Sequence, residues 1–403
     1  MSLIELLKDE KTWNEFLEYK INGGHLTKRE CEELKQYICD KAYLPIVDDI
    51  VLGRNFTIPV MKQINKKNTT KKRTVFLFDD AENYVLKALM FLLHKYDNTF
   101  SRNLYSFRRN IGVKMAIDNI TKNNVTTMFA YKVDIHDYFN SVDTDIMIDI
   151  LKSKIQDDEL LIRFISDLLT QPKAYFNNEL VDCRKGIMAG VPISGFLANL
   201  YIEELDKFFE ERNVLYARYS DDIIVFGQTK EEIDTYKSVI KDFLFGRNLT
   251  INESKEFEIH PHDTIEFLGF SFTNNKVDLS DVALQKIKDK MRRKARALLR
   301  WKTRKKASDE RAIRAYIKHF NKKFFDNPKN NELTWCRWYF PIITTDASLH
   351  TLDEYMLQNI RYIATGKHTK ANYNLRYDTI KSYGFKSLVH AYYNTKADVQ
   401  VIN

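Results

Sequence analysis

Residues 215–226 read LYARYSDDIIVF, and this stretch decides the fold. Two largely apolar runs, 215–218 and 223–226, flank Ser220-Asp221 and predict a tight β-hairpin with adjacent carboxylates at its tip. Adjacent negative charges repel each other, so a pair held in one place favours a bound cation. Aspartate is also common in turns for purely conformational reasons. The hairpin alone therefore leaves a metal site and a plain turn as alternatives.

A third acid, Asp134, ends a separate strand predicted over 127–134, where TMFAYKVD alternates apolar and polar side chains. One carboxylate on this strand and two on a neighbouring hairpin could bind two Mg²⁺ ions about 3.5–4 Å apart. One ion would lower the pKa of an attacking 3′-hydroxyl, and the other would hold a triphosphate and neutralise the leaving pyrophosphate. The acids Asp134, Asp221 and Asp222 together therefore point to nucleotidyl transfer.

The composition of the 403-residue chain favours a helical protein with a substantial core. Hydrophobic residues make up 44% of the chain, which argues against disorder, and only 12 Gly and 7 Pro argue against many short strands. No apolar run approaches the ~18 residues that a membrane span needs, and the first residues lack a signal-peptide pattern. The cysteines form no CxxC pair, which argues against a zinc ribbon or a disulfide framework. We therefore expect a cytoplasmic protein of two or three domains with no membrane partner.

Positive charge gathers in one segment of the chain. Residues 285–323 contain 17 Lys and Arg against three acids, although the whole chain carries a net charge of only +8. Trp301 and Tyr316 lie among these basic residues. This density favours a surface that follows nucleic-acid phosphates, and a solvated helical face is the alternative. The nucleic-acid-binding candidates in the segment are Arg292, Arg293, Lys294 and Arg296.

The rest of the sequence predicts helices with a few strands. Apolar residues recur at helical spacing over 3–20, and Thr27 with Glu30 predicts a capping box for a second helix. Beyond Asp281 nearly all of the chain is predicted to be helical. Further helices are expected over about 80–96, 112–120, 144–170, 194–211 and 230–244, strands within 56–78 and near 257–260 and 265–272, and a hairpin near Asn177-Asn178.

Five ordered motifs resemble those of the bacterial reverse transcriptases of the group II intron, retron and abortive-infection lineage. Residues 132–143 resemble the first palm motif, and Tyr219-Ser220-Asp221-Asp222 resembles the tyrosine-x-Asp-Asp box. The others are the loop and helix that hold template and nucleotide (185–201), the next motif (249–255) and the primer grip (266–270). They follow the family's order and spacing over about 55–275. The last part of the chain, about seventy residues, resembles the extension of the defence-associated (antiphage) and abortive-infection enzymes more than the retron thumb.

The resemblance implies an α+β fold of the right-hand polymerase type. Fingers and palm would combine an antiparallel sheet with helices, and a helical thumb and a helical C-terminal extension would follow. The implied domains are an N-terminal helical segment (1–54), the fingers and palm (55–275), the basic thumb (276–327) and the extension (328–403).

The resemblance also implies catalytic roles. Asp134, Asp221 and Asp222 become ligands of two Mg²⁺ ions, with Mn²⁺ as an alternative ion in vitro, and the Ile135 carbonyl becomes an additional ligand. Lys255 becomes the general acid that protonates the pyrophosphate. The alternative for Lys255 is a solvated loop lysine.

Further residues are implied to contact substrate and nucleic acid. Lys66 and Arg73, in a basic loop, would clamp the triphosphate, and the alternative for this loop is a basic hairpin tip. Gly190 would pack against the incoming nucleotide, next to Ala189 where the family often has Gln. The remaining implied contacts are Phe139 and Tyr219 for the substrate, and Arg108 and Gly269 for the nucleic acid.

The implied function is an RNA-directed DNA polymerase that adds dNTPs to a 3′-hydroxyl, in bacterial defence against phage. Its partners would be an RNA template, which could be a dedicated non-coding RNA, and the DNA product, and a homo-oligomer stays open. Phe139 favours deoxynucleotides because a ring blocks the 2′-hydroxyl, whereas RNA polymerases tend to carry a small or acidic residue there. The alternatives are an RNA-dependent RNA polymerase, a template-independent nucleotidyltransferase and a non-catalytic RNA-binding scaffold. The presence of all three mutually repelling acids argues against the scaffold, because a non-catalytic protein has no need of them.

Overall fold

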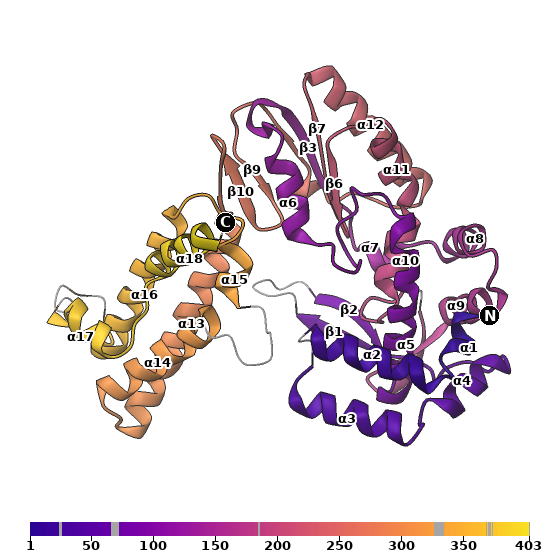
Figure 1. The fold of residues 1–403 in the computed structure, drawn as a ribbon, viewed down its shortest axis with the longest axis horizontal. Helices are drawn as coiled ribbons and strands as arrows, with labels where there is room; N and C mark the ends of the chain where they lie inside the picture. The colour runs from indigo at the N-terminus through magenta and orange to yellow at the C-terminus, as the bar shows by residue number, and fades with distance from the viewer. Residues whose placement is uncertain are drawn as a thin grey trace. The chain divides into compact units, whose positions relative to one another are not determined.

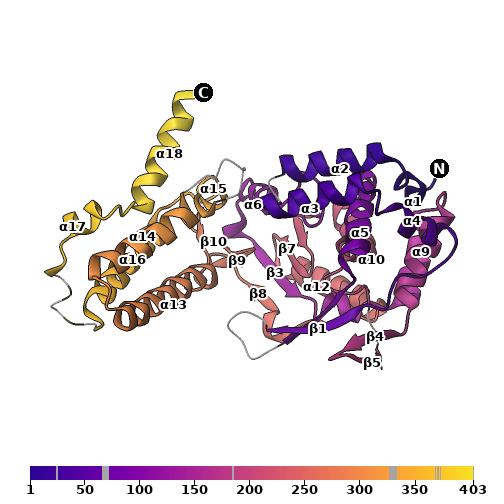
Figure 2. The same ribbon diagram turned by 90° about the horizontal axis from the view of Figure 1, so that it is seen from below.

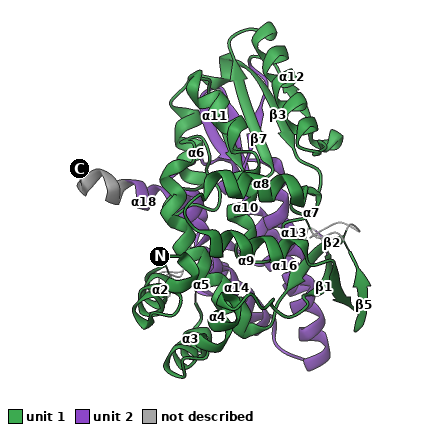
Figure 3. Cartoon of the chain, turned by 90° about the vertical axis from the view of Figure 1, so that its right-hand side faces the viewer, with its two compact units in different colours: residues 1–261 green, residues 262–403 purple. Residues whose placement is uncertain are grey.

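The chain forms two compact units, Met1–Pro261 and His262–Asn403 (Figures 1 and 3). The computed structural model describes residues 1–23, 26–65, 72–183, 186–325, 334–367, 369, 372 and 374–402, with side chains up to residue 396. No helix among these described residues is long and apolar enough to cross a membrane. The functional domain boundaries expected at 54/55, 275/276 and 327/328 stay predictions.

The central sheet of the first unit is antiparallel and contains the hairpin predicted from residues 215–226. Its strand order is β6-β7-β3-β8. The middle strands are apolar on both faces because helices cover them, and α12 (Lys230–Gly246) packs against β3 and β7 (Figure 1). The helices α6 (Val113–Thr121) and α11 (Glu203–Glu211) pack against β6. The strands are β3 (Phe129–Asp134), β6 (Tyr216–Tyr219), β7 (Asp222–Gly227) and β8 (Phe257–Ile259).

A second sheet in this unit has the strand order β2-β1-β4-β5. The predicted hairpin near Asn177-Asn178 is confirmed as the turn between β4 and β5. Asn177 (φ 51°) and Asn178 (φ 68°) both adopt the left-handed conformation that a two-residue hairpin turn requires. The strands are β1 (Val60–Asn65), β2 (Lys72–Leu77), β4 (Lys173–Phe176) and β5 (Glu179–Asp182).

A helical body completes the first unit around a buried central helix. All eight residues of α10 (Ser194–Tyr201) are buried, and α10 packs against α7 and α8. The N-terminal helix α2 packs against α3 and α5, so the first residues join the same core (Figure 2). The remaining elements are α1 (Leu3–Leu6), α2 (Glu10–Asn22), α3 (Lys28–Cys39), α4 (Leu44–Val51), α5 (Asp80–Leu93), η1 (His94–Thr99), η2 (Val125–Thr127), α7 (Tyr138–Ser141), α8 (Thr144–Lys154), α9 (Glu159–Thr170) and η3 (Glu253–Lys255).

The second unit joins a small antiparallel sheet, of order β11-β10-β9, to a group of helices. Its long basic helix α13 buries Ala283, Ile287, Met291 and Ala295 at a spacing of four residues and packs against α14 and α16. The elements are β9 (Ile265–Phe267), β10 (Phe270–Thr273), β11 (Lys276–Leu279), α13 (Asp281–Lys305), α14 (Asp309–Phe324), α15 (Trp335–Tyr339), α16 (Ala347–Thr365), α17 (Tyr377–Ser382) and α18 (Leu388–Ile402).

The predicted α+β class is confirmed, as is the helical character of the described residues beyond Asp281. The capping box is present, because Thr27 Oγ1 accepts from the Glu30 N–H and Glu30 accepts from the Thr27 N–H. The single helix predicted over 3–20 is wrong. Two helices form instead, because the Asp9 side chain accepts from the Lys11 N–H and caps a new helix.

Two other predicted elements are interrupted. The helix predicted over 194–211 breaks at Ile202, whose backbone (φ −123°, ψ 23°) is not helical. The strand predicted over 265–272 is two strands, β9 and β10, joined by a turn at Leu268 (φ 51°) and Gly269 (φ 88°). Hydrophobic spacing fails in both cases because an apolar residue occupies the break and conceals it.

Gly186 gives a test of the packing around α7. An alanine Cβ at this position would lie 2.3 Å from the Phe139 carbonyl oxygen, and Gly186 has φ +52°. We expect Gly186→Ala to lower the free energy of unfolding by about 2–4 kcal/mol, because left-handed strain and a backbone clash add. Urea denaturation measures this, with Gly246→Ala as control, since a Cβ there meets nothing within 4 Å. Equal stability of Gly186→Ala and wild type would contradict the packing described.

Candidate active site

The register of the central sheet brings the three predicted acids to one edge. Asp134 at the end of β3 lies directly opposite Asp222 at the start of β7, and Asp222 also pairs with Tyr219 at the end of β6. Directly opposed residues on antiparallel strands have Cβ atoms about 4.5–5.5 Å apart. The Ile135 N–H donates to the Asp221 carbonyl at 3.1 Å, which ties the turn to the strand that ends on Asp134.

The three acids are largely removed from solvent. Asp134 is only 4% exposed. Burial first, and then the charge of Asp134, raises the pKa of Asp221. Burial and the charge of Asp221 raise the pKa of Asp222 to about 6, against a smaller opposing effect of Lys132. The site therefore holds negative charges that are poorly compensated by the protein alone.

Two side chains after β7 compensate Asp134. Lys255 Nζ lies 2.5 Å from Asp134 Oδ2, and Asn252 Nδ2 donates to Asp134 Oδ1 at 3.1 Å. The Asn252 N–H also donates to the Asp134 carbonyl at 2.8 Å. Burial lowers the pKa of Lys255, but its hydrogen bond to Asp134 and the nearby carboxylates raise that pKa by more. The ammonium ion is therefore stabilised next to the acids.

The donor set suits a divalent cation. In their present arrangement, no group of three or more His, Cys, Asp or Glu among the described residues is placed to hold a metal ion, and Lys255 occupies Asp134. The chemistry still fits, because Asp134, Asp221 and Asp222 offer hard carboxylate oxygens and carry raised pKa values at two of the three positions. The Ile135 N–H faces Asp221, so its carbonyl lies on the same edge of the strand.

A cavity of about 1120 Å³ opens over these acids. Its walls come from β2, from the end of β3 and α7, from the loop before α10, from the hairpin turn and from the segment after α12. Its volume exceeds that of most small-ligand pockets, so it has room for a nucleotide with part of a second molecule. The predicted site residues that line it are Arg73, Asp134, Ile135, Phe139, Gly190, Tyr219, Asp221, Asp222 and Lys255.

Phe139 forms part of an aromatic wall of this cavity. The Phe139 ring meets the Phe107 ring edge to face, with centroids 6.0 Å apart, and the Arg73 guanidinium lies 5.8 Å from the Phe139 centroid. Phe107 is 41% exposed and has φ 53°. Gly195 allows this position, because a Cβ there would lie 2.6 Å from the Phe107 ring. The wall therefore combines two rings and one cation.

The loop that carries Ala189 and Gly190 is attached to β2. The Phe76 N–H donates to the Ala189 carbonyl at 2.8 Å, and Ala189 is buried. Gly190 has φ +99°, and an added Cβ would lie 3.2 Å from the Phe76 carbonyl oxygen. A side chain at Gly190 would therefore meet both backbone strain and β2.

The sequence assigns no individual role to His136 or Asn252, which line the cavity. For Phe107, which also lines it, the alternatives are the core and a template-contacting part of the fingers that residues 103–108 resemble. Asn252 lies within the motif at 249–255, and that motif was a usable signal. The local pattern does not reveal that Phe107 is exposed on a left-handed backbone. The structure is needed for Asn252 and Phe107, because Asn252 contacts Asp134, 118 residues away, and Phe107 packs against Gly195 and Phe139.

Two predicted residues of the first unit are not among the described residues that line the cavity. Lys66 lies outside the described residues. Arg108 is half-buried and donates to the carbonyls of Ser101 (2.7 Å), Leu104 (2.9 Å) and Asp97 (2.7 Å). In this position Arg108 holds the segment before α6 together, and its contact with nucleic acid stays a prediction.

The other predicted nucleic-acid contacts lie in the second unit. Gly269 occupies the turn between β9 and β10, where its carbonyl accepts from the Ser280 N–H at 3.0 Å. The basic candidates are on α13, and three of the four are exposed. They are Arg292, Arg293, Lys294 and Arg296, with Lys294 partly buried.

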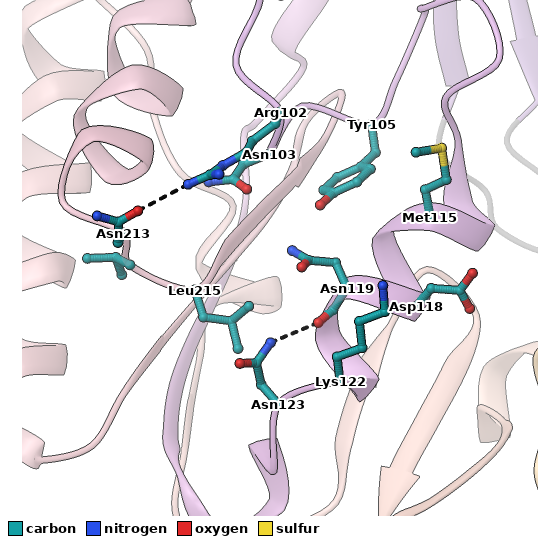
Figure 4. A pocket seen from close by; sticks show the side chains of 11 residues that line it. Arg102, Asn103, Tyr105, Met115, Asp118, Asn119, Lys122, Asn123, Asn213 and Leu215 are labelled. Atoms are coloured by element: carbon teal, nitrogen blue, oxygen red, sulfur yellow. Dashed lines mark hydrogen bonds between the residues drawn. The ribbon is translucent and has the colours of Figure 1, made fainter.

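A separate pocket of about 510 Å³ lies between α6, the segment 102–105 and residues 213–215 (Figure 4). Tyr105 and Asn119 face it, and at its rim Arg102 donates to Asn213 at 3.1 Å. No predicted site residue lines this pocket. It is therefore distinct from the cavity over the acids.

Three curated relatives match part of the chain. The group II intron-encoded protein LtrA of Lactococcus lactis is 23% identical over 209 residues, 50% of this chain and 34% of its own length. The retron Ec83 reverse transcriptase of Escherichia coli is 26% identical over 174 residues, 40% of this chain and 53% of its own. The putative COX1/OXI3 intron 2 protein of Saccharomyces cerevisiae is 24% identical over 155 residues, 38% of this chain and 18% of its own. The chain thus matches between about a fifth and about half of the length of these relatives.

Similarity to solved structures is distant. The telomerase of Candida tropicalis superimposes with a TM-score of 0.47 at 14% identity, over 82% of this chain and 60% of that one. The telomerase of Candida albicans, solved with a fragment of telomeric RNA, gives a TM-score of 0.45 at 12% identity, over 91% and 71%.

The family model described as reverse transcriptase (RNA-dependent DNA polymerase) matches residues 64–272, slightly more than half of the chain. This range includes β3, the hairpin of β6 and β7, and every described residue that lines the cavity over the acids. The chain therefore belongs to the reverse transcriptase family.

Proposed function

We propose that this protein is an RNA-directed DNA polymerase that adds dNTPs to a 3′-hydroxyl with the help of two divalent ions, normally Mg²⁺. One observation carries the proposal: Asp134, Asp221 and Asp222 meet at one sheet edge, beneath a cavity of about 1120 Å³, in a chain of the reverse transcriptase family. Nucleotidyl transfer needs little covalent chemistry from the protein, and positioned charge supplies most of the rate.

The acids would hold the ions, and Lys255 would manage a proton. Asp134, Asp221 and Asp222, with the Ile135 carbonyl, form the ligand set. Bound ions would activate the 3′-hydroxyl and neutralise the leaving pyrophosphate. Lys255 neutralises Asp134 in the present structure, and its raised pKa keeps it protonated near neutral pH. A protonated amine beside the site can donate its proton to the pyrophosphate.

The upper walls of the cavity would select the nucleotide. The Arg73 guanidinium is a fixed positive charge in the lining of the cavity and suits a polyphosphate. Phe139 presents a ring that offers no hydrogen bond, so it can discriminate sugars only by excluding volume. Gly190 is exposed in the lining of the cavity, so its backbone is accessible to a flat base. Phe139 favours dNTPs over rNTPs and so favours a DNA polymerase over an RNA polymerase.

The biological setting follows from resemblance. The C-terminal extension resembles that of the defence-associated enzymes, so we propose a cytoplasmic role in defence against phage with an RNA template. LtrA and the Ec83 enzyme are named as group II intron and retron proteins, which supports RNA as the template class. Sequencing the nucleic acid that purifies with the protein would identify this template.

The acids give the first test. Asp221→Asn or Asp222→Asn should abolish DNA synthesis, because the amide keeps the shape of the side chain but removes the charge that binds cations. Primer extension with Mg²⁺ measures this, with Asp157→Asn, an exposed acid of the same unit, as control. A well-folded double variant with full activity would contradict the proposal and favour the scaffold.

Asp222→Asn should raise the stability of the folded protein, although it abolishes activity. The pKa of Asp222 in the folded protein, about 6, exceeds its unfolded value, so the folded state loses stability as pH rises through this range. In EDTA, Asp222→Asn should therefore melt a few degrees above wild type at pH 8, and the gain should shrink below pH 6. A lower melting temperature of Asp222→Asn at pH 8 would contradict the electrostatic description.

Phe139 separates the two polymerase alternatives. Wild type should prefer dNTPs. Phe139→Ala should lower the ratio of kcat/KM for dNTPs to kcat/KM for rNTPs at least tenfold, which corresponds to about 1.4 kcal/mol of discrimination. Primer extension with each nucleotide class gives the ratio, which corrects for a general loss of activity. Phe245→Ala, on the exposed face of α12, is the control. Equal use of rNTPs by wild type would instead identify an RNA polymerase.

The basic helix α13 should dominate the salt dependence of nucleic-acid binding. If it contacts Z phosphates of a duplex, log K falls with log salt at a slope of about −0.9Z. Replacing Arg292, Arg293, Lys294 and Arg296 with Ala should flatten this slope. The control replaces four exposed cations on α2 and α3, namely Lys11, Lys28, Arg29 and Lys35. If the slope of log K against log salt is unchanged, these residues of α13 do not contact phosphates and serve only to keep the protein soluble.

A further inference from the structure

Arg218 is a fully buried cation immediately before the turn that carries the acids. It is among the largest side chains with no solvent exposure, and its guanidinium lies in the interior of the first unit. A buried charge costs several kcal/mol unless it is paired and hydrogen-bonded. The hydrogen bonds of Arg218 therefore show which parts of the structure depend on this buried charge.

One side of the guanidinium is neutralised by Asp206 of α11. Arg218 Nε donates to Asp206 Oδ1 at 2.7 Å, and Nη2 donates to Asp206 Oδ2. Asp206 is also fully buried and accepts from the Tyr216 hydroxyl at 2.9 Å. Such a pair seldom adds stability over apolar residues of the same volume, so stability alone does not account for it.

The remaining donors of Arg218 reach the catalytic hairpin and the central helix. Nη1 donates to the carbonyl of Ser220 at 3.3 Å, and Nη2 donates to the carbonyl of Asn199 on α10 at 3.1 Å. Asn199 is fully buried, and its Nδ2 donates to the Ser106 carbonyl at 2.8 Å. The ion pair is thereby connected to α10 and to the segment that contains Ser106.

Ser106 completes the contacts to the turn. Its hydroxyl donates to Asn199 Oδ1 at 3.2 Å and accepts from the Ser220 N–H at 2.8 Å. Both polar groups of the Ser220 backbone are therefore held by side chains, one by Ser106 and one by Arg218. Ser220 has φ 60°, a left-handed conformation that a non-glycine residue keeps only when its surroundings impose it.

We propose that Ser106, Asn199, Asp206 and Arg218 are positioning residues that fix Ser220 and thereby hold the carboxylates of Asp221 and Asp222 in the geometry that binds divalent ions. The inference rests on the proposed function and goes further, because it assigns ion affinity to four buried residues that touch neither substrate nor ion. Partners one shell away from metal ligands typically change metal affinity by about 10- to 100-fold when they are lost.

Ser106→Ala tests the contact to the turn with a minimal change. Ser101→Ala is a matched control, because Ser101 is also buried in the same segment and its hydroxyl accepts from a backbone N–H, that of Asn103, away from the catalytic turn. We expect Ser106→Ala to weaken Mn²⁺ binding, measured by electron paramagnetic resonance of the free ion, by about 10- to 100-fold. Ser101→Ala should bind Mn²⁺ as wild type does.

A second variant separates positioning from folding. Arg218→Met, Asp206→Leu and Tyr216→Phe together remove both buried charges and the hydroxyl bonded to them, and only the carbonyls of Ser220 and Asn199 lose a donor. The melting temperature should therefore fall much less than in Arg218→Met alone, which leaves the Asp206 carboxylate buried without its partner. Mn²⁺ affinity should still fall as in Ser106→Ala, and the Mg²⁺ concentration for half-maximal activity should rise with little change in the KM for dNTP. Wild-type Mn²⁺ affinity in either folded variant would overturn the inference.

The binding measurement is independent of polymerase activity. Wild-type protein that binds Mn²⁺ but synthesises no DNA would overturn the proposed function, while the comparison of Ser106→Ala with Ser101→Ala would still decide the role of the buried residues. Wild-type protein that binds no Mn²⁺ would overturn both proposals.

Discussion

Mutual repulsion of three buried carboxylates is the constraint on which the candidate site depends. Asp134, Asp221 and Asp222 share one sheet edge, where burial strengthens every interaction between their charges. Burial first, and then repulsion by the neighbouring acids, raises the pKa values of Asp221 and Asp222, and Lys255, which is paired with Asp134, offsets only part of this rise. Such an arrangement is unfavourable for the protein by itself and becomes favourable when cations neutralise it, as a polymerase site requires.

The backbone and the interior, rather than the acids, hold the arrangement together. Hydrogen bonds of β3, β6 and β7 set which residues face each other, and they form regardless of the charge on the side chains. The left-handed turn at Ser220 is imposed by Ser106 and Arg218, and the burial of Arg218 is made tolerable by Asp206. Backbone strain at Ser220 and the buried charge of Arg218 thus lie next to the acids of the candidate site, as is typical of functional sites.

The two units differ in charge. The first unit places acids beneath the cavity, whose lining also includes Arg73. The second unit contains α13 and α14, where most of the excess of Lys and Arg lies. A polyanion is repelled by uncompensated acids and attracted by a basic helix, so binding of nucleic acid and binding of catalytic ions would be carried by separate parts of the chain.

The sequence alone determined the acids, the hairpin around residues 215–226 and the basic segment 285–323, because each is a local pattern of charge or of alternation. Most residues that line the cavity also fall within the quoted family motifs, although only nine of them were predicted individually. Only the tertiary structure decided the ion pair of Arg218 with Asp206, the contact of Ser106 with Ser220 and the exposure of Phe107. These depend on the packing of α10, α11 and the segment before α6 against one hairpin. Local sequence carries no information about such packing, because a buried arginine and an exposed one look the same in a one-dimensional pattern.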